Sequence, residues 1–128
     1  MTIIQELSIS THVLDTSRGA PAPGIAVTLE RLSPGGTVSL AGRGVTDADG
    51  RIARLLEATP IESAAASSET VTLFRLRFAT GDYLAALGHS VFYPEVAVTF
   101  SVNASDDRRH YHVPLLLSPF GYSTYRGS

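Results

Sequence analysis

Apolar and polar residues alternate along most of this 128-residue chain. From Leu7 to Leu14 the odd-numbered positions carry Leu, Ile, Thr and Val, whereas the even-numbered positions carry two serines, His12 and Leu14. Successive side chains of a β-strand point to opposite faces of its sheet, so this alternation predicts a half-buried strand. His12 is therefore expected on the face opposite to Ile9 and Val13.

The same alternation, interrupted by turn residues, recurs in seven more segments. Turns are expected at Ser33-Pro-Gly-Gly36 and at Asp47-Ala-Asp-Gly50, and the second is interpreted as a hairpin turn in which Gly50 adopts a positive φ. The segment from Thr59 to Thr70 is rich in Ala, Ser and Glu without periodicity, which predicts a surface loop. A short helix is expected at 82–88, ended by Gly88. The expected further strands are 24–32, 38–45, 51–56, 71–78, 92–102, 110–118 and 120–126.

About eight short strands with one short helix are typical of an antiparallel β-sandwich. A chain of this length can build one hydrophobic core but is too short for two. The sequence therefore predicts a single all-β domain that spans residues 1–128.

Composition excludes several classes of function. The formal net charge is −2 and the basic residues are scattered, so the chain lacks the basic surface that nucleic-acid binding requires. There is no cysteine, which excludes disulfides, thiolate nucleophiles and cysteine metal sites. No apolar run approaches the roughly 18 residues of a membrane span, and the N-terminus lacks the pattern of a secretory signal, so a soluble cytoplasmic protein is expected. The low charged fraction of 17% suggests that part of the surface forms subunit interfaces.

The last strands carry the side chains that are best suited to catalysis or binding. Alternation from His110 to Leu117 places Tyr111 and Val113 on the core face and both His110 and His112 on the outer face. That outer face also carries apolar residues such as Leu116. A face that mixes histidines with apolar side chains is typical of a subunit interface that holds functional groups.

Five segments form a recognisable set in chain order. They are 10–24, which begins Ser-Thr-His-Val-Leu-Asp; 46–51, Thr-Asp-Ala-Asp-Gly-Arg; 80–83, Thr-Gly-Asp-Tyr; 92–95, Phe-Tyr-Pro-Glu; and 110–128, which ends Tyr-Arg-Gly-Ser. Together they resemble the 5-hydroxyisourate hydrolase family, transthyretin-related enzymes of urate breakdown. The Tyr-Arg-Gly-Ser ending is the most specific element, because hormone-carrying transthyretins share the fold without it.

The resemblance implies a transthyretin-like β-sandwich that assembles as a homotetramer, a dimer of dimers, with active sites in the central channel. It implies 5-hydroxyisourate as the substrate, water as the nucleophile, and 2-oxo-4-hydroxy-4-carboxy-5-ureidoimidazoline as the product. The resemblance implies that the reaction requires no metal and no organic cofactor.

The family's site residues correspond to five positions of this chain. His12, Arg51 and His112 are expected to be catalytic, and His12, Arg51, Tyr125 and Ser128 to bind substrate. Histidine suits proton transfer near neutral pH, and the guanidinium of arginine suits a planar anionic substrate and a developing oxyanion. Which histidine is the general base stays open. His110, Arg126 and Ser123 are expected either to support these site residues or to have no role in the site.

Other interpretations of these motifs are weaker. His110 and His112 could bind a metal, because residues i and i+2 of a strand face the same way, but no third ligand has a clear spacing. The 47–50 segment lacks the spacing of a calcium loop. Two other functions stay open: a transthyretin-like carrier of a small ligand, and a noncatalytic β-sandwich module. His12, Arg51 and His112 count against the carrier.

Overall fold

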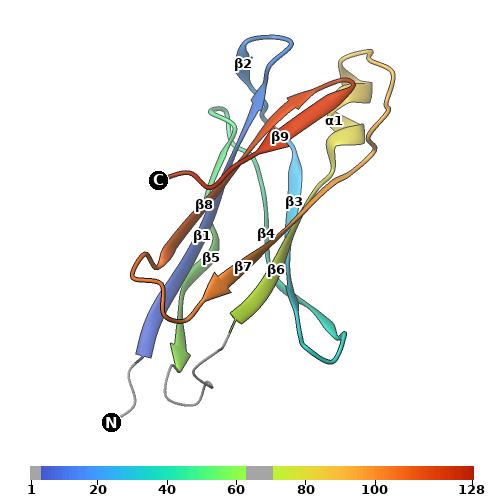
Figure 1. Cartoon of the computed structure of the whole chain (residues 1–128). Helices are drawn as coiled ribbons and strands as arrows, with labels where there is room; N and C mark the ends of the chain where they lie inside the picture. Colours follow the sequence, from blue (N-terminus) through green and yellow to red (C-terminus); the bar gives the residue numbers. More distant parts are fainter. Residues whose placement is uncertain (1–3, 63–70) are drawn as a thin grey trace.

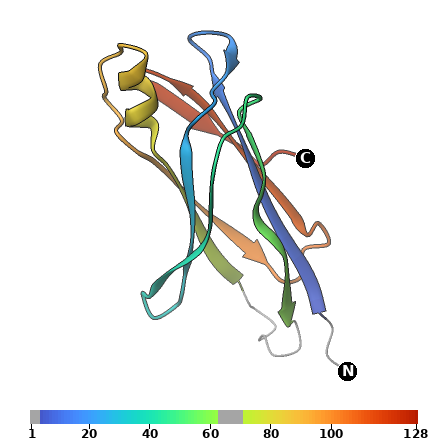
Figure 2. The same ribbon diagram turned by 180° about the vertical axis from the view of Figure 1, so that it is seen from behind.

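The computed structural model describes residues 4–62 and 71–128, which form two facing β-sheets and one short helix (Figure 1). The first sheet contains five strands, in the order β2-β1-β8-β9 with β5 paired to β1, and the second contains four, in the order β4-β3-β6-β7. The view from behind shows α1 at one end of the sandwich (Figure 2). The elements are β1 (Ile4–Asp15), β2 (Ala20–Pro21), β3 (Ala26–Leu32), β4 (Val38–Val45), β5 (Arg51–Glu62), β6 (Val71–Phe78), α1 (Thr80–Ala86), β7 (Val96–Asn103), β8 (His110–Ser118) and β9 (Gly121–Thr124).

The two sheets enclose one hydrophobic core, and the alternation of the sequence identifies its members. Leu7, Ile9 and Val13 of β1 are buried, while His12 on the opposite face is only half-buried. Each fully buried aliphatic or aromatic side chain contributes about 1.5–3 kcal/mol through removal from water. The other fully buried large side chains are Ile25, Val27, Leu29, Leu76, Phe78, Leu84, Val96, Leu115 and Leu117. This confirms the predicted β-sandwich.

One strand pair departs from the expected antiparallel arrangement. β1 pairs with β8 in parallel, from Ser8 opposite His110 to Asp15 opposite Leu117. Parallel strands cannot be joined by a tight turn and need a long connection, which here is the whole of the chain between them. Local turn signals therefore carry no information about this pairing, which lies at the centre of the candidate site.

The helix lies two residues earlier than predicted, at Thr80–Ala86. Its start is fixed by tertiary contacts, because Thr80 is buried and its hydroxyl donates a hydrogen bond to the Tyr93 carbonyl at 2.8 Å. Its end follows the expected stop: Gly88 has a φ of 81°, and His89 N–H donates to the Leu84 carbonyl at 3.0 Å. This is a Schellman motif, which needs the left-handed conformation that glycine adopts without strain.

Further boundaries differ from the prediction. β7 begins at Val96 rather than at residue 92, and β9 ends at Thr124, so Tyr125 and Arg126 lie beyond it rather than within a strand 120–126. β5 extends to Glu62 because its backbone pairs with β1 as far as Ile4, so residues 59–62 are strand rather than loop; residues 63–70 lie outside the described part of the chain. The turn at 47–50 joins β4 of one sheet to β5 of the other, so it is not a hairpin turn. Within residues 4–62 and 71–128, no helix has the length and apolar character needed to cross a membrane.

Candidate functional site

The register of three adjacent strands brings the predicted site residues together. β1 lies between β5 and β8, and His12 pairs with Arg51 on one side and with Pro114 on the other. Ser10 pairs with His112. Residues directly opposite each other on neighbouring strands have Cβ atoms about 5 Å apart. His12, Arg51 and His112 therefore lie within two rows of one sheet face.

The turn before β5 sets the position of Arg51. The Asp47 carboxylate accepts hydrogen bonds from the backbone N–H groups of Asp49 and Arg51, each at 2.9 Å. The Gly50 carbonyl accepts one from Val13 N–H of β1 at 2.7 Å. Gly50 has a φ of 75°, and a Cβ at this position would lie 2.4 Å from the Val13 carbonyl oxygen. Only glycine satisfies both conditions, so this glycine attaches the turn to β1 and aligns Arg51 with His12.

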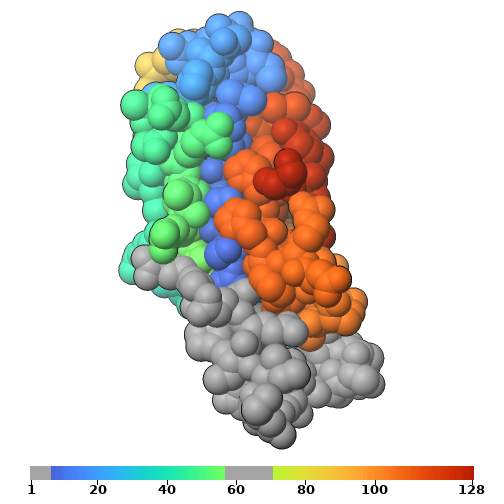
Figure 3. Space-filling view, turned by 90° about the vertical axis from the view of Figure 1, so that its left-hand side faces the viewer, coloured from blue at the N-terminus to red at the C-terminus, as the bar shows by residue number. Residues whose placement is uncertain are grey.

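A hollow of about 570 Å³ opens on this face. In the space-filling view the strip formed by β1 lies between β5 and β8, and the C-terminal residues rest on β8 (Figure 3). The volume lies within the range of small-molecule sites. The polar residues at its wall include Ser8, Ser10, Arg51, Arg54, His110, His112 and Ser128.

A serine hydroxyl links the two histidines of β8. Ser10 Oγ lies 2.9 Å from His110 Nε2 and 2.7 Å from His112 Nδ1. The other ring nitrogen of His110, Nδ1, forms a hydrogen bond with Ser8 Oγ. These contacts follow from the parallel register, because Ser8 and Ser10 stand directly beside His110 and His112. Ser8, His110, Ser10 and His112 thus form one continuous hydrogen-bonded chain.

The environment of His112 favours its neutral form. Partial burial lowers the pKa of His112, and the positive charge of Arg51 and charged forms of His110 and His12 lower it further. A half-buried imidazole loses hydration when protonated, and a nearby guanidinium repels the added charge. His112 is therefore available at neutral pH to accept a proton.

The C-terminal segment packs directly onto His112. Gly127 N–H donates to the His112 carbonyl at 2.8 Å, and the Gly127 carbonyl accepts from Arg108 Nη2 at 2.9 Å. Gly127 is buried, and a Cβ there would lie 2.6 Å from His112 Cδ2. The backbone can lie this close to the His112 ring only because residue 127 has no side chain. The next residue, Ser128, lines the hollow.

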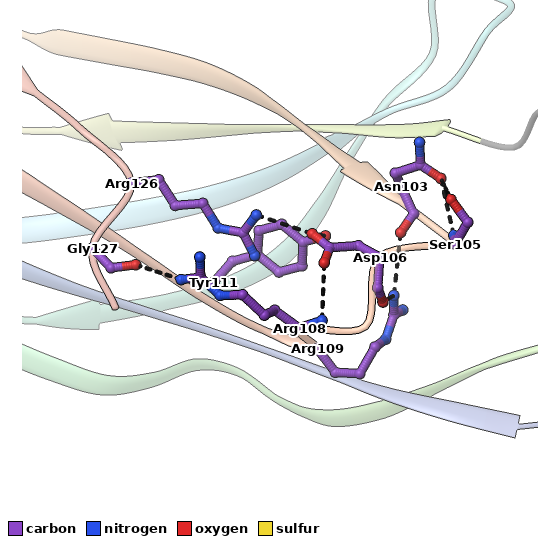
Figure 4. Close-up of polar contacts among 8 residues, drawn as sticks. All are labelled: Asn103, Ser105, Asp106, Arg108, Arg109, Tyr111, Arg126 and Gly127. Carbon is purple, nitrogen blue, oxygen red and sulfur yellow. Dashed lines mark hydrogen bonds and ion pairs between the residues drawn. The ribbon is translucent and has the colours of Figure 1, made fainter.

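The loop between β7 and β8 holds this segment in place (Figure 4). The Asp106 carboxylate accepts hydrogen bonds from Arg108 N–H, Tyr111 OH and Arg126 Nη1, each at 2.9 Å. These contacts, of which the hydrogen bond from Arg108 N–H has the largest effect, lower the pKa of Asp106 to about 2. The guanidinium of Arg126 also lies over the Tyr111 ring, 4.2 Å from its centre, which adds a cation–π contact. Arg126 therefore anchors the C-terminal segment.

The remaining predicted residues lie outside the hollow in the single chain. His12 does not line it, although it is the cross-strand neighbour of Arg51 on the same face. Tyr125 is 56% exposed and lines a second, smaller hollow with Arg126, together with Tyr111 and Val113 from the core-facing side of β8. Ser123 of β9 is exposed and pairs with Leu116.

Sequence reasoning missed Ser8, Ser10, Arg54 and Asp106. The two serines share the alternating face with His12, which was the available signal, but their link to the histidines depends on the parallel pairing. Asp106 has no signal in the sequence, because the loop contact with Arg126 is made only after folding. In the part of the chain that the structure describes, no cluster of three or more His, Cys, Asp or Glu side chains could hold a metal ion.

Comparison with known proteins identifies the family. Residues 9–127 match the model of the HIUase/Transthyretin family. The 5-hydroxyisourate hydrolase of Salmonella dublin is 44% identical over 120 residues, which cover 94% of this chain and 80% of that protein. The solved structure of Klebsiella pneumoniae 5-hydroxyisourate hydrolase superimposes with a TM-score of 0.75 at 33% identity, covering 95% of this chain and 99% of that one.

A second solved structure is similar to the same degree. Sea bream transthyretin in complex with thyroxine has a TM-score of 0.77 and 29% identity, covering 94% of each chain. A hydrolase and a ligand-binding protein thus share this sandwich, so the fold alone does not decide between them. The family match covers nearly the whole length and includes His12, Arg51 and His112: this chain belongs to the HIUase/Transthyretin family.

Proposed function

We propose that this protein hydrolyses 5-hydroxyisourate, opening its six-membered ring by attack of water on a carbonyl carbon to give 2-oxo-4-hydroxy-4-carboxy-5-ureidoimidazoline. The observation that carries the proposal is the pairing, in one hollow, of a histidine held neutral with an arginine. Relatives named 5-hydroxyisourate hydrolase, at 44% identity over most of the chain, support the substrate.

His112 is the general base in this proposal. Its lowered pKa keeps the imidazole unprotonated, and its Nδ1 already bonds Ser10. Nε2 makes no hydrogen bond to any described residue and is the nitrogen left to take a proton from water. His12, one row away on the same face, then protonates the nitrogen that leaves when the ring opens.

Arg51 binds the substrate and stabilises its charge. The guanidinium offers several N–H donors in one plane, which matches the oxygen-rich edge of a planar purine derivative. Negative charge that develops on the attacked carbonyl oxygen is stabilised by the same group. Ser128 at the wall of the hollow supplies a further contact to the ring, whereas Tyr125, which lines the smaller hollow of its own chain, is proposed to reach the substrate only in the assembled protein. No step needs a metal or an organic cofactor.

The active form is proposed to be a cytoplasmic homotetramer, a dimer of dimers, with the sites in the channel between dimers. β7 and β9 end their sheets, and both contribute to the smaller hollow, so two unpaired strand edges are adjacent in the single chain. Phe92 and Phe120, 63% and 68% exposed, add apolar surface near these edges. Pairing of such edges with a second copy would satisfy their backbone groups.

The test generates 5-hydroxyisourate in place from urate with urate oxidase and follows its ultraviolet absorbance with and without the protein. Strong acceleration is expected, and His12→Ala, Arg51→Ala and His112→Ala are each expected to remove most of it while remaining folded. No acceleration by the folded protein would contradict the proposal.

A carrier of a small ligand is the second candidate, favoured by the likeness to the thyroxine complex of sea bream transthyretin. The carrier predicts tight binding of thyroxine and no hydrolysis. Two arginines and two histidines at the wall of the hollow disfavour it, because burying them against a mainly apolar ligand would desolvate charged groups without partners. Titration with thyroxine followed by calorimetry decides this point.

A further inference from the structure

The hydrogen-bonded chain of Ser8, His110, Ser10 and His112 has a role beyond shaping the hollow. We propose that Ser10 and His110 form a proton relay behind His112, so that the positive charge created when His112 accepts a proton from water is transferred to His110. The inference rests on the proposed hydrolysis, and it assigns functions to Ser10 and His110 as positioning residues that act through His112.

The relay requires a donor and an acceptor at every contact, and the geometry provides them. Ser10 is buried, with 6% of its surface exposed, and its hydroxyl lies within hydrogen-bond distance of one nitrogen from each ring. A serine hydroxyl can donate one hydrogen bond and accept two, and the hydrogen of buried Ser10 has no acceptor among the described residues other than these rings, so it is hydrogen-bonded only when Ser10 donates to one ring and accepts from the other. The tautomer of His110 and the tautomer of His112 are therefore coupled through Ser10.

Two arrangements satisfy all three contacts and also keep the Ser10 hydrogen in a hydrogen bond. In the first, His112 Nδ1–H donates to Ser10, Ser10 donates to His110 Nε2, and His110 Nδ1–H donates to Ser8, which leaves His112 Nε2 as an acceptor facing the substrate. In the second, every hydrogen bond is reversed and His112 Nε2 carries a proton. Reversal converts His112 from a base into a proton donor without moving a heavy atom.

The step balances in protons. His112 Nε2 takes a proton from water, and its Nδ1–H bond breaks as that proton passes to Ser10 Oγ. The Ser10 hydroxyl proton passes to His110 Nε2, while the hydroxide left by water adds to the substrate carbonyl. Ser10 ends unchanged in proton count, His112 ends neutral with its proton on Nε2, and His110 ends as a cation that solvent can deprotonate.

Burial and charge give the relay its direction. His110 is exposed and His112 half-buried, so a cation is better hydrated on His110. The groups that face His112 are Arg51 from β5, His12 from β1, His110 on β8 itself and Ser128 from the C-terminal segment, with Arg54 at the same wall. The fixed charge of Arg51 disfavours a cation on His112, which agrees with the direction in which the pKa of His112 is shifted.

Three variants separate proton transfer through Ser10 and His110 from a purely structural role of their hydrogen bonds. Ser10→Ala removes both hydrogen bonds, while Ser10→Thr keeps the hydroxyl and restores them. His110→Gln keeps a polar atom near the position of Nε2, but the glutamine amide cannot be protonated. Ser39→Ala, at an exposed position on β4 in the other sheet, is the control for the serine substitution.

The relay predicts a loss in kcat with little change in KM. Ser10→Ala and His110→Gln are each expected to lower kcat by about 10- to 100-fold, at or below the lower end of the roughly 10²- to 10⁴-fold that general acid–base catalysis supplies. Ser10→Thr is expected to recover most of the wild-type kcat. In mixtures of H₂O and D₂O, the kcat of the wild type should vary nonlinearly with the deuterium fraction, because several protons move together. The kcat of His110→Gln should vary linearly with the deuterium fraction.

Nitrogen-15 NMR of the histidine rings tests the inference without turnover. In the wild type the ring nitrogens of His110 and His112 are expected to shift together as the pH is lowered, and in Ser10→Ala each ring should titrate alone. A wild type that lacks hydrolase activity but shows coupled titration would refute the proposed hydrolysis and not the coupling. Unchanged ring spectra in Ser10→Ala, or wild-type kcat in His110→Gln, would overturn the relay.

Discussion

Gly127 lies against the ring of His112, so close that a Cβ on Gly127 would be 2.6 Å from His112 Cδ2. A contact shorter than 3.0 Å forces either the ring or the C-terminal segment to move. The ring is already held by Ser10, and the segment by Arg108 and by the His112 carbonyl. A side chain at residue 127 therefore has no space to occupy without disturbing the candidate base.

We expect Gly127→Ala to lower kcat by about 10²-fold, the scale of a displacement of about 1 Å at a reacting group. Steady-state kinetics with 5-hydroxyisourate would measure it. The control is Gly35→Ala in the turn between β3 and β4, where an added Cβ meets nothing within 4 Å. Equal activity of the two variants would show that the packing of Gly127 on His112 is unimportant.

Asp106→Asn should loosen the C-terminal segment and do so in a pH-dependent manner. The folded pKa of Asp106 is about 2, below the unfolded value of about 3.9, so its carboxylate stabilises the fold above about pH 4. That stabilisation is lost as the pH falls from about 4 to 2. The melting temperature of Asp106→Asn is expected to lie below that of the wild type at pH 6, and the gap should close near pH 2.

Asp107→Asn is the matched control, since the neighbouring side chain makes no hydrogen bond to a described residue. Its melting temperature should follow that of the wild type across the same pH range. Asp106→Asn is also expected to weaken substrate binding through Arg126 and Ser128, seen as a higher KM. A constant difference in melting temperature from pH 6 to pH 2 would argue against Asp106 as the charged anchor.

The lowered pKa of His112 is expected to set the acid limit of the proposed activity. If neutral His112 is the base and takes up the first proton itself rather than through Ser10 and His110, kcat/KM should stay near its maximum below the ordinary histidine pKa of about 6.5 and fall only at the lower pKa of the folded protein. The same shift makes the folded state bind fewer protons than the unfolded state, so His112 also lowers stability as the pH falls through that window.

Arg51→Gln tests the origin of this shift. Removing the guanidinium removes a cause of the lowered pKa, second only to burial, so the pKa of His112 measured by NMR should rise toward 6.5. Arg43→Gln, a charge change on the exposed face of β4, serves as the comparison. A His112 pKa that is the same in both variants would mean that Arg51 does not set it.

The sequence allows the faces of the strands to be predicted, and with them most of the sandwich. Alternation alone places Ile9 and Leu115 in the core and His12 and His112 on the outer face, because the pattern reports burial directly. It does not report which strands are neighbours. The parallel pairing of β1 with β8 joins residues about a hundred positions apart, and no turn signals it.

The candidate site divides in the same way. Arg51, His12 and His112 were predicted from motifs, whereas Ser10 and Asp106 depend on contacts made only in the folded chain. A serine on a polar strand face is ordinary until its partner strand is known. β5 was predicted too short for a related reason: its second half is held by backbone pairing with β1, which leaves no mark in side-chain polarity.

Gly50 offers a final test of how the turn positions Arg51. Gly24 and Gly50 have nearly the same φ, 78° and 75°, but an added Cβ meets nothing within 4 Å at Gly24 and would lie 2.4 Å from the Val13 carbonyl oxygen at Gly50. Gly24→Ala therefore measures only the strain of a left-handed residue, about 1–2 kcal/mol. Gly50→Ala adds displacement of the turn from β1, so we expect a larger loss of unfolding free energy and a fall in kcat/KM that Gly24→Ala does not show. Denaturant unfolding and kinetics on both variants measure this, and equal effects would mean that the Gly50 contact with β1 does not align Arg51 with His12.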